Sequence, residues 1–259
     1  MIDNALRAGH PIPDALADRA HVRKRLLDQR QPVPPAQDLH RLFPDTFTDS
    51  DLGPIPEGWE VKRLPEAIEV NPRRQLKKGT FAPYLDMKSM PTGSARASDR
   101  WDREFKSGTR FVNGDVLLAR ITPCLENGKT AYVDFLDDGQ VGWGSTEYIV
   151  FRSRPPLRPE HAYFLCRSAA FRDHAILNMT GTSGRQRVPA SCFDRYDVVV
   201  PAPAVCEAFG KLARGIMVRM KVNDEESRTL ASIRDALLPK IISGEIRVKD
   251  AEQIIRRCV

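Results

Sequence analysis

A heptad repeat near the C-terminal end of the sequence constrains the fold more than any other feature. Two positions recur there with a spacing of seven, and the seam that they form is apolar at both ends and polar in the middle. The first position holds Phe209, Ile216, Asn223, Leu230 and Leu237, and the second holds Leu212, Arg219, Glu226 and Ile233.

Flanking residues predict where this helix begins and ends. Pro203 marks its start, Pro239 is expected to interrupt it, and Ser243-Gly244 is expected to stop it. At a rise of about 1.5 Å per residue the rod is roughly 50 Å long, which is longer than a small domain is wide. Such a helix cannot bury its whole seam against one compact domain. We therefore expect a coiled-coil spacer helix within residues 203–242, with a second helix as its partner.

Overall composition limits the class of protein. The 259 residues, 41% of them hydrophobic, suffice for one medium domain with attachments. No apolar run approaches the roughly 18 residues that span a bilayer, and the start lacks a secretory signal, so we expect a cytoplasmic protein without membrane contact. Five scattered cysteines and five histidines, none at metal-binding spacing, predict no metal site. The net charge of +6 is compatible with a polyanionic partner.

The chain divides into four parts. Residues 1–50 predict a helix, a proline-rich linker and a docking strip, residues 51–202 the main domain, residues 203–242 the spacer helix, and residues 243–259 a C-terminal tail. The main domain interleaves short strand patterns with one helix pattern over 159–177, which favours an α+β fold over a doubly wound sheet. The expected strands are 82–87, 115–121, 130–135, 147–151 and 196–200.

Three segments approach catalytic motifs without completing them. Residues 139–146 have the spacing of a phosphate loop but lack its lysine, and Asn71-Pro72 lacks the rest of an amino-methyltransferase motif. Asp86-Met87-Lys88 resembles the end of a nuclease motif that needs a further acidic ligand. No catalytic residue is predicted. A nuclease or methyltransferase with a cryptic site at Asp86 or Asn71 is the alternative, and a coiled-coil adaptor with merely solvated loops is a third interpretation.

Three basic loops lie between the strand patterns. They fall within residues 71–78, within residues 96–110, where aromatic residues are interleaved, and within residues 181–188, where two glycines flank hydroxyl groups. The guanidinium group of arginine can donate two parallel hydrogen bonds to phosphate oxygens or to guanine, and a glutamine amide can pair with adenine. The loops therefore predict a nucleic-acid surface, although each one taken singly is also compatible with an ordinary solvated turn.

Six segments occur in a recognisable order. They are residues 42–59, Phe111–Pro123, Gly128-Lys129, Gly144–Thr146, Gly181–Val188 and Leu237–Ile246. In order and spacing this series resembles the specificity subunits of type I restriction-modification systems, and the resemblance covers roughly residues 40 to 250.

The resemblance implies a DNA-recognition subunit that is not an enzyme by itself. In this family a target recognition domain reads one half of a split DNA sequence, and a helical spacer fixes the distance to the other half. Modification subunits methylate adenine with S-adenosylmethionine, and restriction subunits use ATP to translocate and cut DNA. These cofactors and Mg²⁺ are therefore expected on partner subunits and not on this chain.

Family members usually carry two recognition domains and two spacers, whereas this sequence contains one pattern of each. This difference leads to the hypothesis of a homodimer with antiparallel spacers. Asn223 lies near the centre of the seam, where Arg219 of one chain could face Glu226 of the other. Two-fold symmetry then implies two inverted copies of one half-site. Pairing with a different specificity chain is the rival hypothesis.

The resemblance also divides the basic residues by role. Patterns shared among subunits that read different sequences cannot carry the difference, so Arg120 and the loop 181–188 are assigned to scaffold or phosphate positioning. The idiosyncratic loops supply the pool for base contacts, which is Arg73, Arg74, Lys77, Lys88, Arg96, Arg100 and Arg103. The remaining predicted DNA-binding residues are Arg120, Thr182, Ser183, Arg185, Gln186 and Arg187, with Gln186 a secondary candidate for adenine.

Overall fold

The structure is a computed structural model that describes residues 1–28, 39–182 and 184–247. The expected proline-rich linker, Ser183 and the end of the C-terminal tail lie outside these residues. The chain divides into two compact units, Met1–Leu212 and Ala213–Val259.

The N-terminal part of the first unit is helical. It contains α1 (Ile2–Ala8), a 3-10 turn, α2 (Ala17–Asp28) and the short 3-10 helix Leu39–Leu42. Arg23 of α2 forms an ion pair with the buried Asp3 of α1. The Asn4 side chain donates hydrogen bonds to the carbonyl oxygens of His40 and Phe43, at 2.7 and 2.8 Å. These bonds fix α1 to the segment that the sequence predicted as a docking strip.

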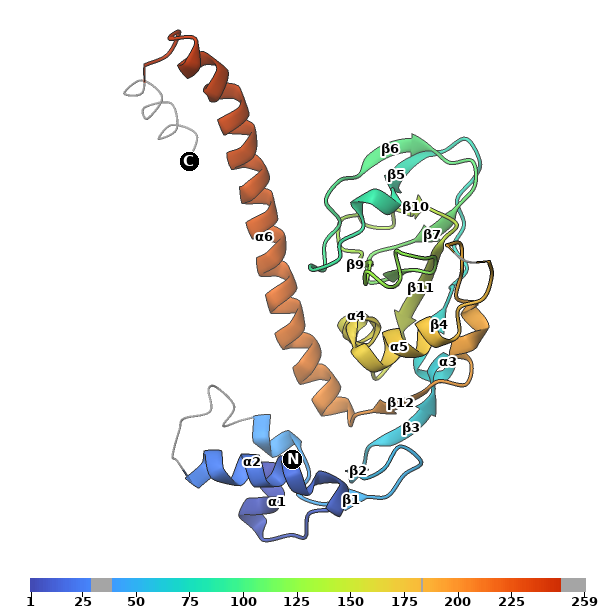
Figure 1. Cartoon of the computed structure of the whole chain (residues 1–259), viewed down its shortest axis with the longest axis vertical. Helices are drawn as coiled ribbons and strands as arrows, with labels where there is room; N and C mark the ends of the chain where they lie inside the picture. The colour runs from blue at the N-terminus through green and yellow to red at the C-terminus, as the bar shows by residue number, and fades with distance from the viewer. Residues whose placement is uncertain (29–38, 183, 248–259) are drawn as a thin grey trace. The chain divides into compact units, whose positions relative to one another are not determined.

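Two four-stranded sheets form the body of the first unit (Figure 1). In the first sheet the strands follow the order β6 (Trp101–Glu104), β5 (Phe81–Leu85), β10 (Gly142–Gly144) and β7 (Thr109–Phe111), in which β5 and β10 are parallel and the other neighbours are antiparallel. In the second sheet the strands follow the order β4 (Ile68–Val70), β11 (Tyr148–Ser153), β8 (Val116–Ala119) and β9 (Thr130–Tyr132), and all neighbours are antiparallel.

Shorter elements complete the first unit. Strand β1 (Phe47–Thr48) pairs with β2 (Ile55–Pro56), and β12 (Asp197–Val200) pairs with β3 (Glu60–Arg63), all antiparallel. The helices of the main domain are α3 (Leu64–Ala67), α4 (Pro159–Arg167) and α5 (Ala169–Leu177).

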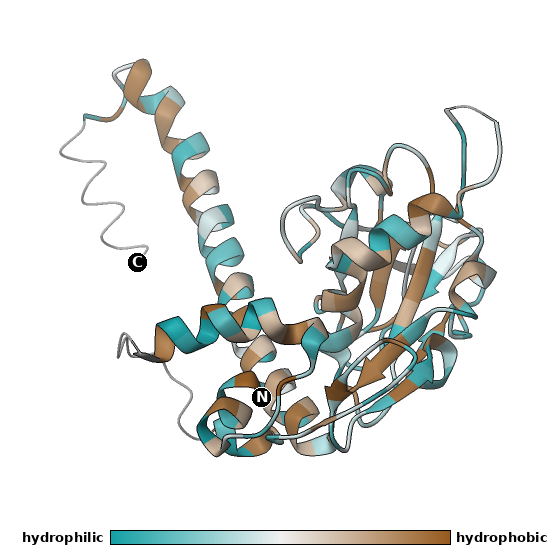
Figure 2. Ribbon diagram, turned by 60° about the horizontal axis from the view of Figure 1, so that its bottom comes forward, coloured by the Kyte–Doolittle hydropathy of each residue, from teal (hydrophilic) through white to brown (hydrophobic). Residues whose placement is uncertain are grey.

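Alternate residues of the central strands enter two separate packing layers. Leu117 of β8 and Val150 of β11 belong to a buried cluster with Leu85 and Phe111 of the other sheet. Phe151 instead makes edge-to-face contacts with Phe171 of α5 and with Phe193. Hydrophobic residues accordingly follow one another along strands of the first unit (brown in Figure 2).

The α+β prediction is confirmed, and each of the five expected strands overlaps a strand of the structure. The single helix expected over 159–177 is wrong, because the chain forms α4 and α5 with a break at Ser168. Ser168 has extended backbone angles, and its hydroxyl accepts a hydrogen bond from the Phe171 amide at 3.3 Å. A serine N-cap inside the apolar pattern therefore starts a new helix.

The long helix is present as α6, which extends over Pro203–Ile242 (Figure 1). The expected interruption at Pro239 is wrong, since α6 continues through this residue. Pro239 cannot donate to the carbonyl of residue 235, but only three residues of α6 follow it, so little of the helix depends on this one bond. The expected stop is confirmed: the Gly244 amide bonds to the Ile241 carbonyl, and Gly244 adopts a φ of +77°, which is favourable only for glycine.

Candidate nucleic-acid interface

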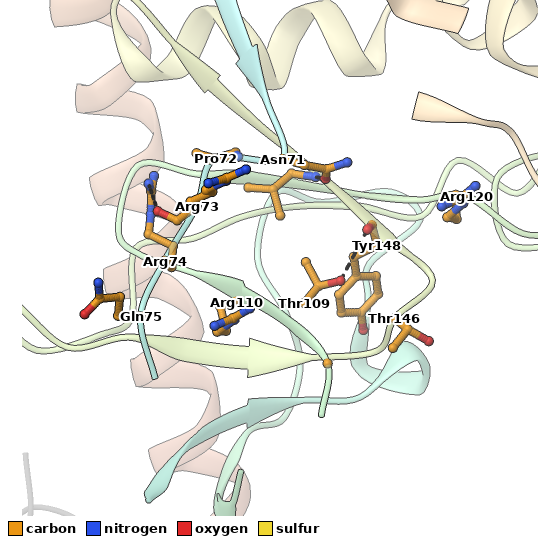
Figure 3. A pocket seen from close by; sticks show the side chains of 12 residues that line it. Asn71, Pro72, Arg73, Arg74, Gln75, Thr109, Arg110, Arg120, Thr146 and Tyr148 are labelled. Carbon is orange, nitrogen blue, oxygen red and sulfur yellow. Dashed lines mark hydrogen bonds between the residues drawn. The ribbon is translucent and has the colours of Figure 1, made fainter. Parts of the chain in front are cut away.

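A pocket of about 540 Å³ lies where several strands of the two sheets begin or end. Residues 71–75 follow β4, residues 108–110 enter β7, Arg120 follows β8, and Thr146 precedes β11. Figure 3 shows four arginine side chains around this pocket, which are Arg73, Arg74, Arg110 and Arg120.

Backbone geometry fixes the walls of this arginine pocket. Asn71 has a φ of +51°, which is uncommon for a residue with a side chain. Its amide donates to the Val150 carbonyl at 2.7 Å, and its side-chain oxygen accepts from the Val150 amide at 3.0 Å. Gly108 has a φ of +152°, and a Cβ there would lie 2.2 Å from the Gly144 carbonyl oxygen. A side chain at residue 108 would therefore displace β10 or the turn before β7.

One buried carboxylate orients an arginine of the pocket. Asp115 is completely buried and accepts hydrogen bonds from the Val112 amide at 2.8 Å and from Arg74 at 3.3 Å. Arg152 donates to the same carboxylate oxygen as Arg74. Asp115 thus connects Arg74 to the core of the sheet and limits the directions in which its guanidinium group can point.

Three of the predicted DNA-binding residues, Arg73, Arg74 and Arg120, lie together in the arginine pocket, although Arg120 is distant from the other two in sequence. Arg110 and Thr146 also line it and were not among the predicted contacts. Arg110 belongs to the second basic loop, so its charge was the sequence feature that could have identified it. Thr146 carried no signal apart from its place in the segment Gly144–Thr146.

The other members of the base-contact pool lie outside this pocket. Arg96 is buried and forms an ion pair with Asp134, so its guanidinium group is engaged inside the chain. Arg100 lies 4.9 Å from the ring centroid of Phe135. Arg103, on β6, is 4.9 Å from the Tyr84 centroid and 5.8 Å from that of Trp143. Stacking of this kind holds a guanidinium plane in place while its edge stays able to donate hydrogen bonds. Lys77 and Lys88 are exposed.

The loop at residues 181–188 is anchored by its backbone and by one ion pair. Gln186 donates its amide to the Thr122 hydroxyl at 3.1 Å. Arg187 forms an ion pair with Glu147 at 2.8 Å, and this hydrogen-bonded carboxylate raises the pKa of Arg187. Thr182 and Arg185 are exposed, and their backbones form a turn. In the described structure Arg187 is therefore an anchor of the loop, while Arg185 is accessible to a ligand.

Most of the predicted seam on α6 is solvent-exposed in the single chain. Leu212, Ile216 and Leu230 are 59%, 53% and 52% exposed, and all three occupy the predicted heptad positions. Phe209, at the start of the seam, contacts the rings of His161 and Phe164. Phe209 and Leu212 also line an almost wholly apolar pocket of about 380 Å³ in the first unit, together with Leu39, Leu42, Phe43, Trp59, His161, Pro201, Val205 and Ala208.

Asp86, the centre of the alternative nuclease site, caps a short 3-10 helix by accepting from the Lys88 amide. Within the described ranges, no group of three histidine, cysteine or acidic side chains is arranged to hold a metal ion. None of the helices in that part of the chain has both the length and the apolarity to cross a bilayer.

Comparisons with known proteins give sequence relatives of one kind. No protein-family model matches the chain. It is 33% identical over 159 residues to the Escherichia coli type I restriction enzyme EcoEI specificity subunit, covering 57% of this chain and 26% of the relative. It is 29% identical over 185 residues to the EcoAI specificity subunit of the same organism, covering 69% and 31%. The chain thus spans about a third or less of the length of these relatives. The structure of the HsdS subunit from Thermoanaerobacter tengcongensis matches with a TM-score of 0.45 and 20% identity, over 73% of this chain and 51% of that one.

Proposed function

We propose that the chain belongs to the family of type I restriction enzyme specificity subunits, as its sequence relatives do, and that it is the DNA-reading, non-catalytic subunit of such a complex. The first unit reads one half-site, and α6 sets the distance to the second. The arginine pocket is the observation that supports this proposal most, because it gathers cationic side chains from three separate segments on one surface.

The proposed partners follow from the family. Double-stranded DNA is the ligand, and modification and restriction subunits supply the chemistry with S-adenosylmethionine, ATP and Mg²⁺. Such a complex works on DNA in the cytoplasm. A stand-alone nuclease or methyltransferase predicts activity of the purified chain with Mg²⁺ or a methyl donor. A purely structural adaptor predicts no DNA binding even together with a modification subunit.

Two single substitutions distinguish phosphate contacts from base contacts. We expect Arg185→Ala, in the exposed turn, to weaken binding to all duplexes about equally and to reduce the dependence of the binding constant on salt concentration. We expect Arg100→Ala to cost about 1–3 kcal/mol on the cognate duplex and to relax specificity at one position. Fluorescence anisotropy with cognate and scrambled duplexes, over a series of salt concentrations, measures both effects. Equal behaviour of the two variants would contradict the division of roles.

The exposed seam supports a second part of the proposal, which is that two copies pair through antiparallel α6 helices. A second helix that covers the exposed leucine and isoleucine side chains on one helix face removes them from water and so stabilises the pair. In such a pair Arg219 and Glu226 lie near the polar centre of the seam, and the two recognition units read inverted copies of one half-site. A different specificity chain offering a similar helix is the rival partner.

Solution mass decides whether the purified chain pairs with itself. We expect light scattering to give twice the 29.2 kDa of the chain at micromolar concentrations, because the apolar ends of the seam then become buried. Dilution should shift the mass toward that of one chain. A monomer at every concentration would contradict self-pairing and favour a different chain as the partner.

A further inference from the structure

We propose that the arginine pocket holds one phosphate group of the DNA backbone and so acts as a sequence-independent anchor. This inference rests on the proposed function and adds to it the class of ligand that this pocket takes. The pocket is large enough for a phosphate with its adjoining sugars, and its four arginines come from the segments after β4, before β7 and after β8.

The first argument is an excess of positive charge. Among the described residues, Arg73, Arg110 and Arg120 have no carboxylate within ion-pair distance. Asp115 is shared by Arg74 and Arg152, and the Glu147 carboxylate is engaged by Arg187. Three of the four arginines in the pocket therefore lack a counter-charge, and the repulsion between the cations falls when an anion enters.

Unsatisfied hydrogen-bond donors are the second argument. The Nε atoms of Arg74 and Arg120 are buried and have no partner. A buried nitrogen without a hydrogen bond costs free energy, so both side chains are stabilised when they turn toward an acceptor that enters the pocket. Other polar groups of the wall are already used: the Asn71 oxygen accepts from the Val150 amide, and Thr109 donates to the Tyr148 carbonyl at 3.4 Å.

The balance of donors and charge favours phosphate over a base. The edge of a base is neutral, and a side chain that reads it faces at most two or three hydrogen-bonding groups. A phosphate carries a full negative charge and presents only acceptors, which matches a pocket lined by guanidinium groups. Arg74, which Asp115 orients, is suited to hold a fixed position on the backbone.

Arginine side-chain NMR on the full chain tests the site directly. We expect inorganic phosphate and dimethyl phosphate to shift the Nε–H signals of Arg74 and Arg120, because these donors acquire an acceptor. Dimethyl phosphate represents the diester of DNA, and adenosine monophosphate represents a free nucleotide. A duplex should reverse the shifts caused by dimethyl phosphate. Binding of adenosine monophosphate that a duplex does not displace would overturn the DNA backbone as the source.

Duplex binding by variants provides the second readout. We expect Arg120→Gln and Arg73→Gln each to lower the affinity for cognate and scrambled duplexes equally, by about tenfold. Each should also lower the slope of log affinity against log salt concentration by about 1. Lys62→Gln, which removes a cation of β3 paired with Glu60, is the control and should leave both quantities unchanged. Arg73 is exposed, so its variant remains informative even if Arg120→Gln impairs folding.

The outcomes separate this inference from the proposed function. Loss of affinity for the cognate duplex alone would overturn the anchor and make the pocket a base reader. Unchanged affinity in both variants, with wild-type binding intact, would overturn the anchor and leave DNA recognition standing. A wild-type chain that binds no duplex, alone or with a modification subunit, would overturn both.

Discussion

Replacement of Asp115 by alanine is expected to lower the free energy of unfolding by about 3 kcal/mol. The Asp115 carboxylate has no exposed surface and accepts hydrogen bonds from Arg74, Arg152 and the Val112 amide. Its removal leaves two arginines without their counter-charge and one amide without its acceptor. We place the loss at the lower end for buried pairs, because Arg152 is 36% exposed and regains part of its hydration.

Urea denaturation followed by circular dichroism measures this loss. Asp138→Ala, at an exposed residue, is the matched control and should change stability by less than about 0.5 kcal/mol. Asp115→Asn retains an oxygen for the Val112 amide but loses the charge, so it should fall between the two. A loss below about 1 kcal/mol for Asp115→Ala would mean that Asp115 does not organise the arginines.

Local sequence patterns predicted the strands of the buried core but did not predict the short strands around them. β8 and β11 consist largely of aliphatic and aromatic residues, which is the composition of a strand buried on both faces. β6 is exposed along its whole length, and β10 is Gly-Trp-Gly, so neither shows a strand pattern. Pairing with β5 holds both strands, and a pairing partner cannot be inferred from local periodicity.

The candidate site was only partly predictable for the same reason. Charge identified Arg73, Arg74 and Arg120 one by one, but their convergence depends on the antiparallel pairing of β4 and β8 with β11. Arg96 shows the opposite case, because its charge indicated a surface contact whereas it is buried against Asp134. Sequence charge therefore identifies candidates, and the sheet order decides which of them share a pocket.

Introduction of two carboxylates into the seam is expected to abolish pairing of α6. In Ile216→Asp/Leu230→Asp, both substitutions fall at the first heptad position and replace side chains that are about half exposed in the single chain. A homodimer would bury four such half-exposed aliphatic side chains, each worth about 0.8–1.5 kcal/mol, and would bury four carboxylates in the variant. We expect the dissociation constant to rise by at least about a thousandfold.

The helix provides a matched control for this experiment. Val218→Asp/Ser232→Asp adds the same two carboxylates with the same spacing of fourteen residues, but on the opposite side of α6. Leu230→Asp costs a few tenths of a kcal/mol more in helix propensity than Ser232→Asp, which is small beside the burial of the seam, so seam burial is the main difference between the variants. Sedimentation velocity should find the seam variant monomeric and the control dimeric. Dimers in both variants would place the interface elsewhere in the chain. Monomers in both would attribute the loss to a weakened helix, and the spacing of half-sites would then need another origin than the pairing of these seams.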